Sequence, residues 1–224
     1  MLWPAEDSPA VATGTSLPFF FFSVSRNWPK SLNGAFGFAE IDGAPVPHGV
    51  YEQLLRSYDE GVAEGAVLDW SAVFLTAVRN IDPATAGFGY VAFAVTMTVG
   101  RLTGDRVVHR LGATRVVLFG SLLAASGFLL AILAPSWMLS IIGFGLVGAG
   151  ASNVVPVMFS AAGRQHVMPT HLAVAAITTM GYAGVLLGPA LLGFVAKATT
   201  LSFALGLLAA LLVAVAMTAR VVTR

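Results

Sequence analysis

The sequence predicts an all-α protein, a polytopic membrane helix bundle with five full spans and a partial sixth. Three observations lead to this prediction. Of the 224 residues, 57% are hydrophobic and only 10% are charged, whereas a soluble domain carries about 25% charged residues. The mean hydropathy is +0.82. No acidic residue follows Asp105, so the second half of the chain is almost purely apolar.

The same composition excludes several functional classes. The chain has no cysteine, which rules out disulfides, zinc–thiolate centres and iron–sulfur clusters. Its net charge of +1 is too small for a nucleic-acid-binding face. The histidines at 109, 166 and 171 lack metal-ligand spacing, and no hydrolase, metalloprotease or phosphate-loop motif is present. We therefore expect no enzyme, no metal, no cofactor and no nucleic-acid partner.

The expected spans follow from length. A helix rises about 1.5 Å per residue, so about 20 mainly apolar residues cross the hydrocarbon layer. Five segments meet this requirement, namely Ala86–Gly104, Val116–Ala134, Trp137–Gly163, Leu172–Ala196 and Leu201–Ala219. Gly61–Val78 is a weaker sixth candidate because it carries two acidic residues.

The connections between these segments are polar and set the orientation. We expect a charged loop over Asp105–Arg115, a tight stop at Pro135, a basic loop over Arg164–His171 and a polar turn over Lys197–Thr200. Seven cations fall on one side of the membrane and two on the other. The seven are Arg101, Arg106, Arg110, Arg115, Arg164, Arg220 and Arg224, and the two are Arg79 and Lys197. Lysine and arginine favour the cytoplasmic side, so the C-terminus is predicted to be cytoplasmic.

Residues 1–60 differ from the rest in composition. They contain six prolines and scattered acids, and we expect a loop-rich or disordered, non-spanning segment, with a short helix over Val50–Asp59. The apolar run around Phe19–Phe22 is too short to span, but it could dip into the membrane interface. The predicted division is therefore 1–60 and a helix bundle over 61–224.

Small residues and prolines punctuate the apolar segments. Gly100 and Gly104 are four residues apart, as are Gly184 and Gly188, a spacing that lets membrane helices approach closely. Pro156 and Pro189 lie within predicted spans and are expected to kink them. A functional hinge and a simple packing kink are both open interpretations.

Three stretches resemble a known family. Residues 100–112, GRLTGDRVVHRLG, resemble the cytoplasmic loop signature G-x-x-x-D-R-x-G-R-R of the major facilitator superfamily, with wider spacing after Asp105. Residues 181–193, GYAGVLLGPALLG, resemble the glycine–proline helix of the same transporters. Residues 64–71, EGAVLDWS, are similar to the seventh helix of one branch of this superfamily, the inner-membrane proteins akin to fucose-type sugar permeases. The signature residues are Gly100, Arg101, Gly104, Asp105, Arg106, Arg110 and Gly112, and the packing or kink residues are Gly181, Gly184, Gly188, Pro189 and Gly193.

The resemblance implies the carboxy-terminal half of such a transporter, equivalent to helices 7–12, in a bacterial inner membrane. The intact system would move a small solute by proton- or ion-coupled alternating access, with the site between two halves. Asp105 would act as a gate latch toward the other half, or else lie in a solvated loop. One half alone suggests a truncated product that pairs with another half or with itself. The alternative is a non-transporting interaction protein or a non-functional fragment.

Five polar or aromatic residues are candidates for solute or proton binding. Glu64 and Asp69 could be coupling acids in a water-filled cavity, or could lie in the headgroup region. They are five residues apart and therefore point to different helix faces. Trp70 could stack on a sugar-like ligand. Asn153 could bind solute or join two helices, and Tyr182 could line a cavity or pack in the core.

Overall fold

A computed structural model describes residues 40–41, 44–45, 48–164 and 169–217. The expectation for Phe19–Phe22 lies outside these residues. The chain divides into two compact units, Met1–Pro45 and Val46–Arg224. In the first unit, β1 (Glu40–Ile41) pairs antiparallel with β2 (Ala44–Pro45).

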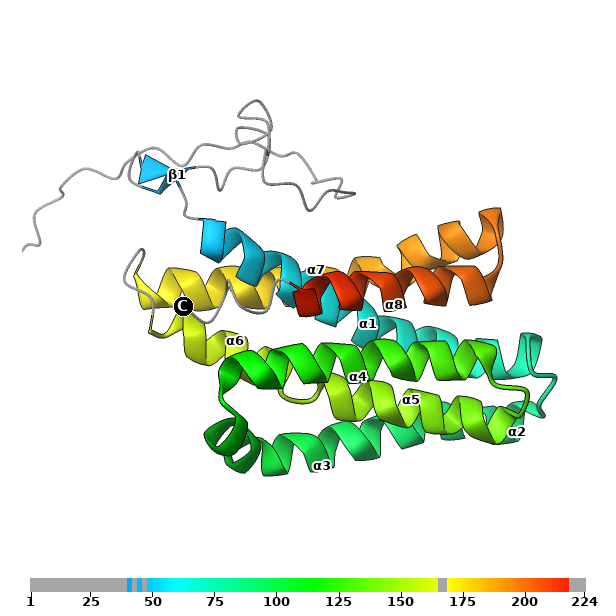
Figure 1. Ribbon diagram of the computed structural model, residues 1–224. Helices are drawn as coiled ribbons and strands as arrows, with labels where there is room; N and C mark the ends of the chain where they lie inside the picture. The colour runs from blue at the N-terminus through cyan, green and yellow to red at the C-terminus, as the bar shows by residue number, and fades with distance from the viewer. Residues whose placement is uncertain (1–39, 42–43, 46–47, 165–168, 218–224) are drawn as a thin grey trace, which may run out of the picture. The chain divides into compact units, whose positions relative to one another are not determined.

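The second unit is a bundle of helices (Figure 1). Its elements are α1 (His48–Ala77), α2 (Pro83–Ala86), α3 (Phe88–Leu111), α4 (Ala113–Leu133), α5 (Trp137–Ala151), α6 (Val154–Ala162), α7 (Thr170–Ala198) and α8 (Leu201–Met217). The α3–α4 turn and the end of α6 lie at one end of the bundle (Figure 1). The α1–α2, α4–α5 and α7–α8 connections lie at the other end.

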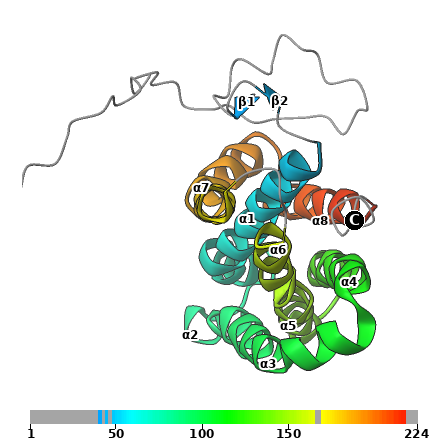
Figure 2. The ribbon, with the colours of Figure 1, turned by 90° about the vertical axis from the view of Figure 1, so that its left-hand side faces the viewer.

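The long helices form two groups when viewed from the end of the bundle (Figure 2). In one group α5 packs between α3 and α4, and in the other α1 packs against α7. Helix α8 joins the groups through α4. A continuous apolar core, including Phe74, Phe128 and Phe144, fills the space between them. The rings of Phe74 and Phe144 meet edge to face.

Helix α1 begins at His48, well before the start expected near Gly61. No proline interrupts residues 48–60, and the helix buries Leu54 and Val62 on either side of the expected boundary. The short helix expected over Val50–Asp59 is the first part of α1. The charged residues in this stretch do not end the helix, and two of them, Arg56 and Glu60, are buried in the bundle.

The charged loop expected over Asp105–Arg115 is wrong. Helix α3 continues through Leu111, and α4 begins two residues later at Ala113. Charged residues are compatible with a helix, and only Gly112 breaks it, with a φ of 81° that suits glycine. The signature is therefore the last turns of a helix followed by a one-residue turn.

The single span expected over Trp137–Gly163 is divided into α5 and α6 at Ser152 and Asn153. Pro156 explains the position of the break. A proline has no N–H and its ring clashes with the carbonyl four residues earlier, which here belongs to Ser152. Pro189, in contrast, lies inside α7 without ending that helix.

Three helical segments in the described residues are long and apolar enough to cross a membrane. They are Ala113–Leu133, Trp137–Ala162 and Thr170–Ala198, while Leu201–Met217 is apolar but shorter. Helices α1 and α3 carry several charged residues. The structure thus supports a membrane helix bundle.

Candidate functional site

An ion pair links the two most highly charged helices. Nη2 of Arg101 on α3 lies 3.6 Å from Oε2 of Glu64 on α1. The side chains are 47% and 38% exposed, respectively, so the pair sits at the edge of the bundle. It brings together a residue of the loop signature and a candidate coupling acid.

Trp70 is engaged within the chain. Its Nε1–H donates a hydrogen bond to the carbonyl oxygen of Pro189, at 3.1 Å, and its ring packs against Gly193. Pro189 has no N–H, and the carbonyl freed by this belongs to Val185. That oxygen faces Gly65, where an added Cβ would lie 2.7 Å away. Trp70 therefore joins α1 to α7 at the proline.

Asn153 joins the α5–α6 break to α3. Its Nδ2 donates to the carbonyl of Gly100 at 3.1 Å and to Oγ of Ser152 at 3.0 Å. The two signature glycines are needed for this contact, because a Cβ on Gly100 would meet Ser152 and one on Gly104 would meet Asn153. Of the two interpretations of Asn153, the structure shows the interhelical contact.

The charged signature residues lie at the surface. Asp105, Arg106 and Arg110 are exposed on the last turns of α3. These residues and Arg101 lie in the C-terminal part of α3. This part of the helix leads into the α3–α4 turn at one end of the bundle (Figure 1).

The glycines of α7 lie against α1. A Cβ on Gly184 would meet the carbonyl oxygen of Tyr58, and one on Gly188 would lie 2.9 Å from Cα of Val62. Gly61 in turn faces the carbonyl of Gly181. Backbone meets backbone along this contact, which is how small residues pack membrane helices.

Among the described residues, neither Asp69 nor Tyr182 forms a hydrogen bond or ion pair with Glu64 or Arg101. Both are exposed, and the Tyr182 side chain has 66% of its surface accessible. The candidate residues therefore do not converge on one closed cavity in this unit.

A polar group on α1 consists of residues that the sequence analysis places outside the helix bundle. Arg56 is 1% exposed and Glu60 is 2% exposed, both on α1. Asp59 lies beside them on the same helix. The signal was present in the spacing, since positions 56, 59, 60 and 64 fall one or two turns apart on a helix. The sequence-based prediction misses this group because it places the start of the bundle at Gly61.

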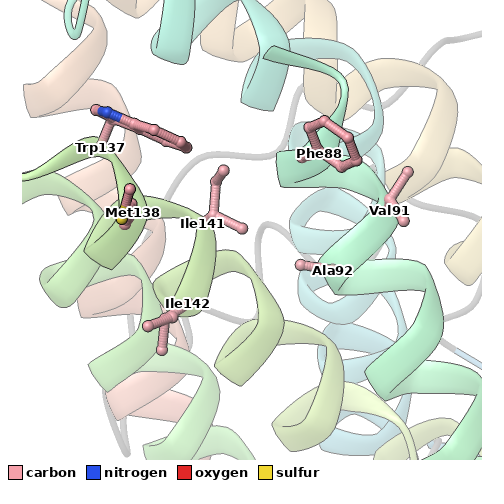
Figure 3. Close-up of a pocket in the computed structure, with 7 residues that line it drawn as sticks. All are labelled: Phe88, Val91, Ala92, Trp137, Met138, Ile141 and Ile142. Carbon is pink, nitrogen blue, oxygen red and sulfur yellow. The ribbon is translucent and has the colours of Figure 1, made fainter. Parts of the chain in front are cut away.

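An apolar groove lies between the N-terminal ends of α3 and α5 (Figure 3). Side chains of the two helices face each other across it, and they are Phe88, Val91, Ala92, Trp137, Met138, Ile141 and Ile142. It has almost none of the converging polar groups that orient a solute, and none of the candidate residues lines it. Among the described residues, no cluster of acids or histidines could hold a metal ion.

Comparisons with known proteins place this geometry in a family. Residues 64–224 match the Major Facilitator Superfamily. The chain is 59% identical over 163 residues to an uncharacterized MFS-type transporter of Yersinia pestis, covering 73% of this chain and 42% of that protein. It is 36% identical over 212 residues to an uncharacterized transporter of Sinorhizobium fredii, covering 92% of this chain and 55% of the relative. Membrane protein MosC of Rhizobium meliloti is 34% identical over 144 residues, covering 64% of this chain and 35% of MosC.

A solved structure shares the fold. The crystal structure of a peptide transporter in complex with alafosfalin matches with a TM-score of 0.66 at 16% identity, covering 87% of this chain and 42% of that one. The chain thus spans about half the length, or less, of the proteins it matches. The family expected from the loop signature is confirmed: this chain belongs to the Major Facilitator Superfamily.

Proposed function

We propose that this chain acts as the carboxy-terminal half of a transporter that moves a small solute by proton- or ion-coupled alternating access. The family match and the relatives named as transporters support this role. The matched region is about half of each of those proteins, so the proposed transport needs a second half in addition to the helices described here.

The Glu64–Arg101 pair carries the proposal. Its two partly exposed charges belong to different helices of a bundle whose surface is otherwise rich in exposed Leu, Val and Phe. Charged side chains at membrane depth are costly unless they face a partner or water. We infer that this edge of α1 and α3 borders the water-filled solute path between two halves.

The remaining candidates take supporting roles in this proposal. Asp69 and Tyr182 are exposed and would contact the solute or the second half. The exposed carboxylate of Asp105 would meet a helix N-terminus or an arginine of that half. Asn153 would set the distance between α3 and the α5–α6 break.

In the proposed topology α3, α4, α7 and α8 each form one span, and α5 and α6 together form another. Helix α1 is the sixth span. The α3–α4 turn carries the basic signature and would face the cytoplasm of a bacterial inner membrane. The C-terminus would lie on the same side. The sugar-permease branch remains part of this proposal, through residues 64–71.

The test uses vesicles. The chain is reconstituted alone and together with the amino-terminal half of the Yersinia relative, and an entrapped pH dye reports proton flux when a panel of sugars, amino acids and drugs is added. We expect solute-dependent flux in the mixed vesicles. Glu64→Gln should abolish it. Asp82→Asn, at an exposed position before α2, should not. An absence of flux with every solute, at every protein density, would overturn the proposal.

A further inference from the structure

Arg56, Asp59 and Glu60 of α1 form a polar group, here called the Arg56 cluster, in which Arg56 and Glu60 are buried and Asp59 is half-buried. Asp59 and Glu60 each lie about one helical turn from Arg56, at the i+3 and i+4 positions. Arg56 and Glu60 are 1% and 2% exposed, which is rare for charged residues in any protein interior. The proposed transport does not yet use this cluster.

Neighbouring helices enclose the cluster. Ser121 of α4, whose hydroxyl is buried, lies near Glu60. Gly184 of α7 packs on the backbone of Tyr58, and Ser57 donates to the sulfur of Met158 on α6 at 3.2 Å. Helices α4, α6 and α7 therefore pack around this part of α1, where Arg56 and Glu60 are buried and Asp59 is partly exposed.

The charges around Glu60 do not balance. The described charged groups that act on it are Arg56, Asp59 and Glu64, all on α1. Glu64 is itself paired with Arg101. Three carboxylates therefore share two guanidinium groups, and guanidinium keeps its charge at any ordinary pH. Among the described residues, these groups carry an excess of one negative charge.

A single bound cation would remove the excess. Among the described residues no group of acids and histidines has the arrangement of a metal site. Neither carboxylate oxygen of Glu60 accepts a hydrogen bond of good geometry from any described residue. A proton on one of these oxygens fits both observations, since it adds a positive charge and needs no further ligand.

We propose that Glu60 is a proton-binding residue of this transporter, holding one exchangeable proton that neutralises the Arg56 cluster. The proposal rests on the proposed function. One O–H bond forms on a carboxylate oxygen of Glu60 when the cluster is enclosed, with the proton taken from water. The bond breaks and the proton returns to water when movement of α7 or α4 opens the cluster.

Infrared spectroscopy of the full chain in lipid nanodiscs tests this directly. The wild type should show a carboxylic-acid C=O stretch that persists to a higher pH than an exposed glutamate allows. Glu60→Gln, which keeps the shape of the neutral side chain, should remove this band. The control Asp82→Asn should retain it. Replacing potassium by sodium in the buffer should leave it unchanged.

A second variant separates the two acids of the cluster. Asp59→Asn removes the excess negative charge, so Glu60 becomes the counter-ion of Arg56 and should lose its proton at a lower pH than in the wild type. Loss of the whole band in Asp59→Asn, with a normal band in Glu60→Gln, would overturn the assignment to Glu60. A band that sodium removes would overturn the assignment to a proton.

The infrared result and the flux result are independent. A band that depends on Glu60 without solute flux would refute the transport proposal but leave the proton site standing. Solute flux with no Glu60-dependent band would refute the proton site alone. Matching elution of each variant and wild type on size exclusion shows that the fold is retained.

Discussion

Two arginines near opposite ends of α1 have very different surroundings. Arg79 follows the C-terminus of the helix and donates to neutral acceptors, from Nε to Oγ of Ser140 at 3.1 Å and from Nη2 to the carbonyls of Ala131 and Ile132, both at 2.8 Å. Its guanidinium also lies 5.4 Å from the ring centroid of Phe74. These carbonyls belong to the last turn of α4, where a cation is favoured.

Arg56, in contrast, is surrounded by acids. Asp59 and Glu60 lie within one turn of it on α1. The two arginines, Arg56 buried and Arg79 half-buried, differ in the groups that accept their hydrogen bonds or balance their charge. Neutral carbonyls make Arg79 a fixed structural link between α1, α4 and α5, whose state does not change with pH. Acidic neighbours give the Arg56 cluster a charge that a proton can change.

The largest expected effect tests the structural side of the comparison. Arg79→Ala removes three hydrogen bonds from a charged donor and leaves the α4 carbonyls without that donor. It should lower the free energy of unfolding by about 3 kcal/mol, measured by denaturant titration in micelles. The loss should be the same at acidic and alkaline pH. Lys197→Ala, at an exposed position in the last turn of α7, should change stability by less than about 0.5 kcal/mol.

The second prediction concerns the wall that encloses the Arg56 cluster. Gly184→Ala places a methyl group against the carbonyl oxygen of Tyr58, so α7 must move away from α1. Overpacking of this kind costs about 2 kcal/mol. The matched control is Gly206→Ala, where the nearest atom to the new Cβ is 4.0 Å away. Equal thermal stabilities of the two variants would contradict the close α1–α7 contact.

A smaller effect is expected at the α5–α6 break. Asn153→Ala removes the hydrogen bond to Gly100 and should cost about 1 kcal/mol, as interhelical hydrogen bonds in membranes do. Ser160→Ala removes a hydrogen bond within α6 at an exposed position and serves as the control. If both variants unfold at the same denaturant concentration as wild type, Asn153 does not join the helices.

The smallest stability effect belongs to the partly exposed ion pair. Glu64→Gln should change the unfolding free energy by less than about 0.5 kcal/mol, because exposed ion pairs contribute little. The same variant should abolish solute flux. A stability loss as large as that of Arg79→Ala would mean that the Glu64–Arg101 pair is a structural link rather than part of the solute path.

The apolar helices were predictable because composition alone decides them. The expected start and end of the segment Val116–Ala134 agree closely with α4. The polar turn expected over Lys197–Thr200 is shorter, because α7 continues through Ala198 and only Thr199 and Thr200 separate it from α8. Length and hydropathy fix such segments, since few other structures can hold so many apolar residues in a row.

Charged residues caused the errors. The sequence predicts a loop from Asp105, although nothing before Gly112 prevents a helix. It also predicts a non-spanning segment up to residue 60, where acids such as Asp59 and Glu60 stand among prolines and polar residues. Sequence alone does not show whether a charge is solvated or enclosed by other helices. The contacts of Trp70 with Pro189 and of Glu64 with Arg101 were equally inaccessible, because they depend on how helices distant in sequence pack.

The most direct test of the central claim measures the unfolding free energy of wild type and Glu60→Gln in micelles as the pH is raised. A folded chain that keeps a proton which the unfolded chain has released loses stability as pH rises. Wild type should therefore weaken toward alkaline pH, while Glu60→Gln stays nearly constant, so the difference in favour of the variant grows. Parallel curves for the two proteins would contradict a proton held by Glu60 in the Arg56 cluster.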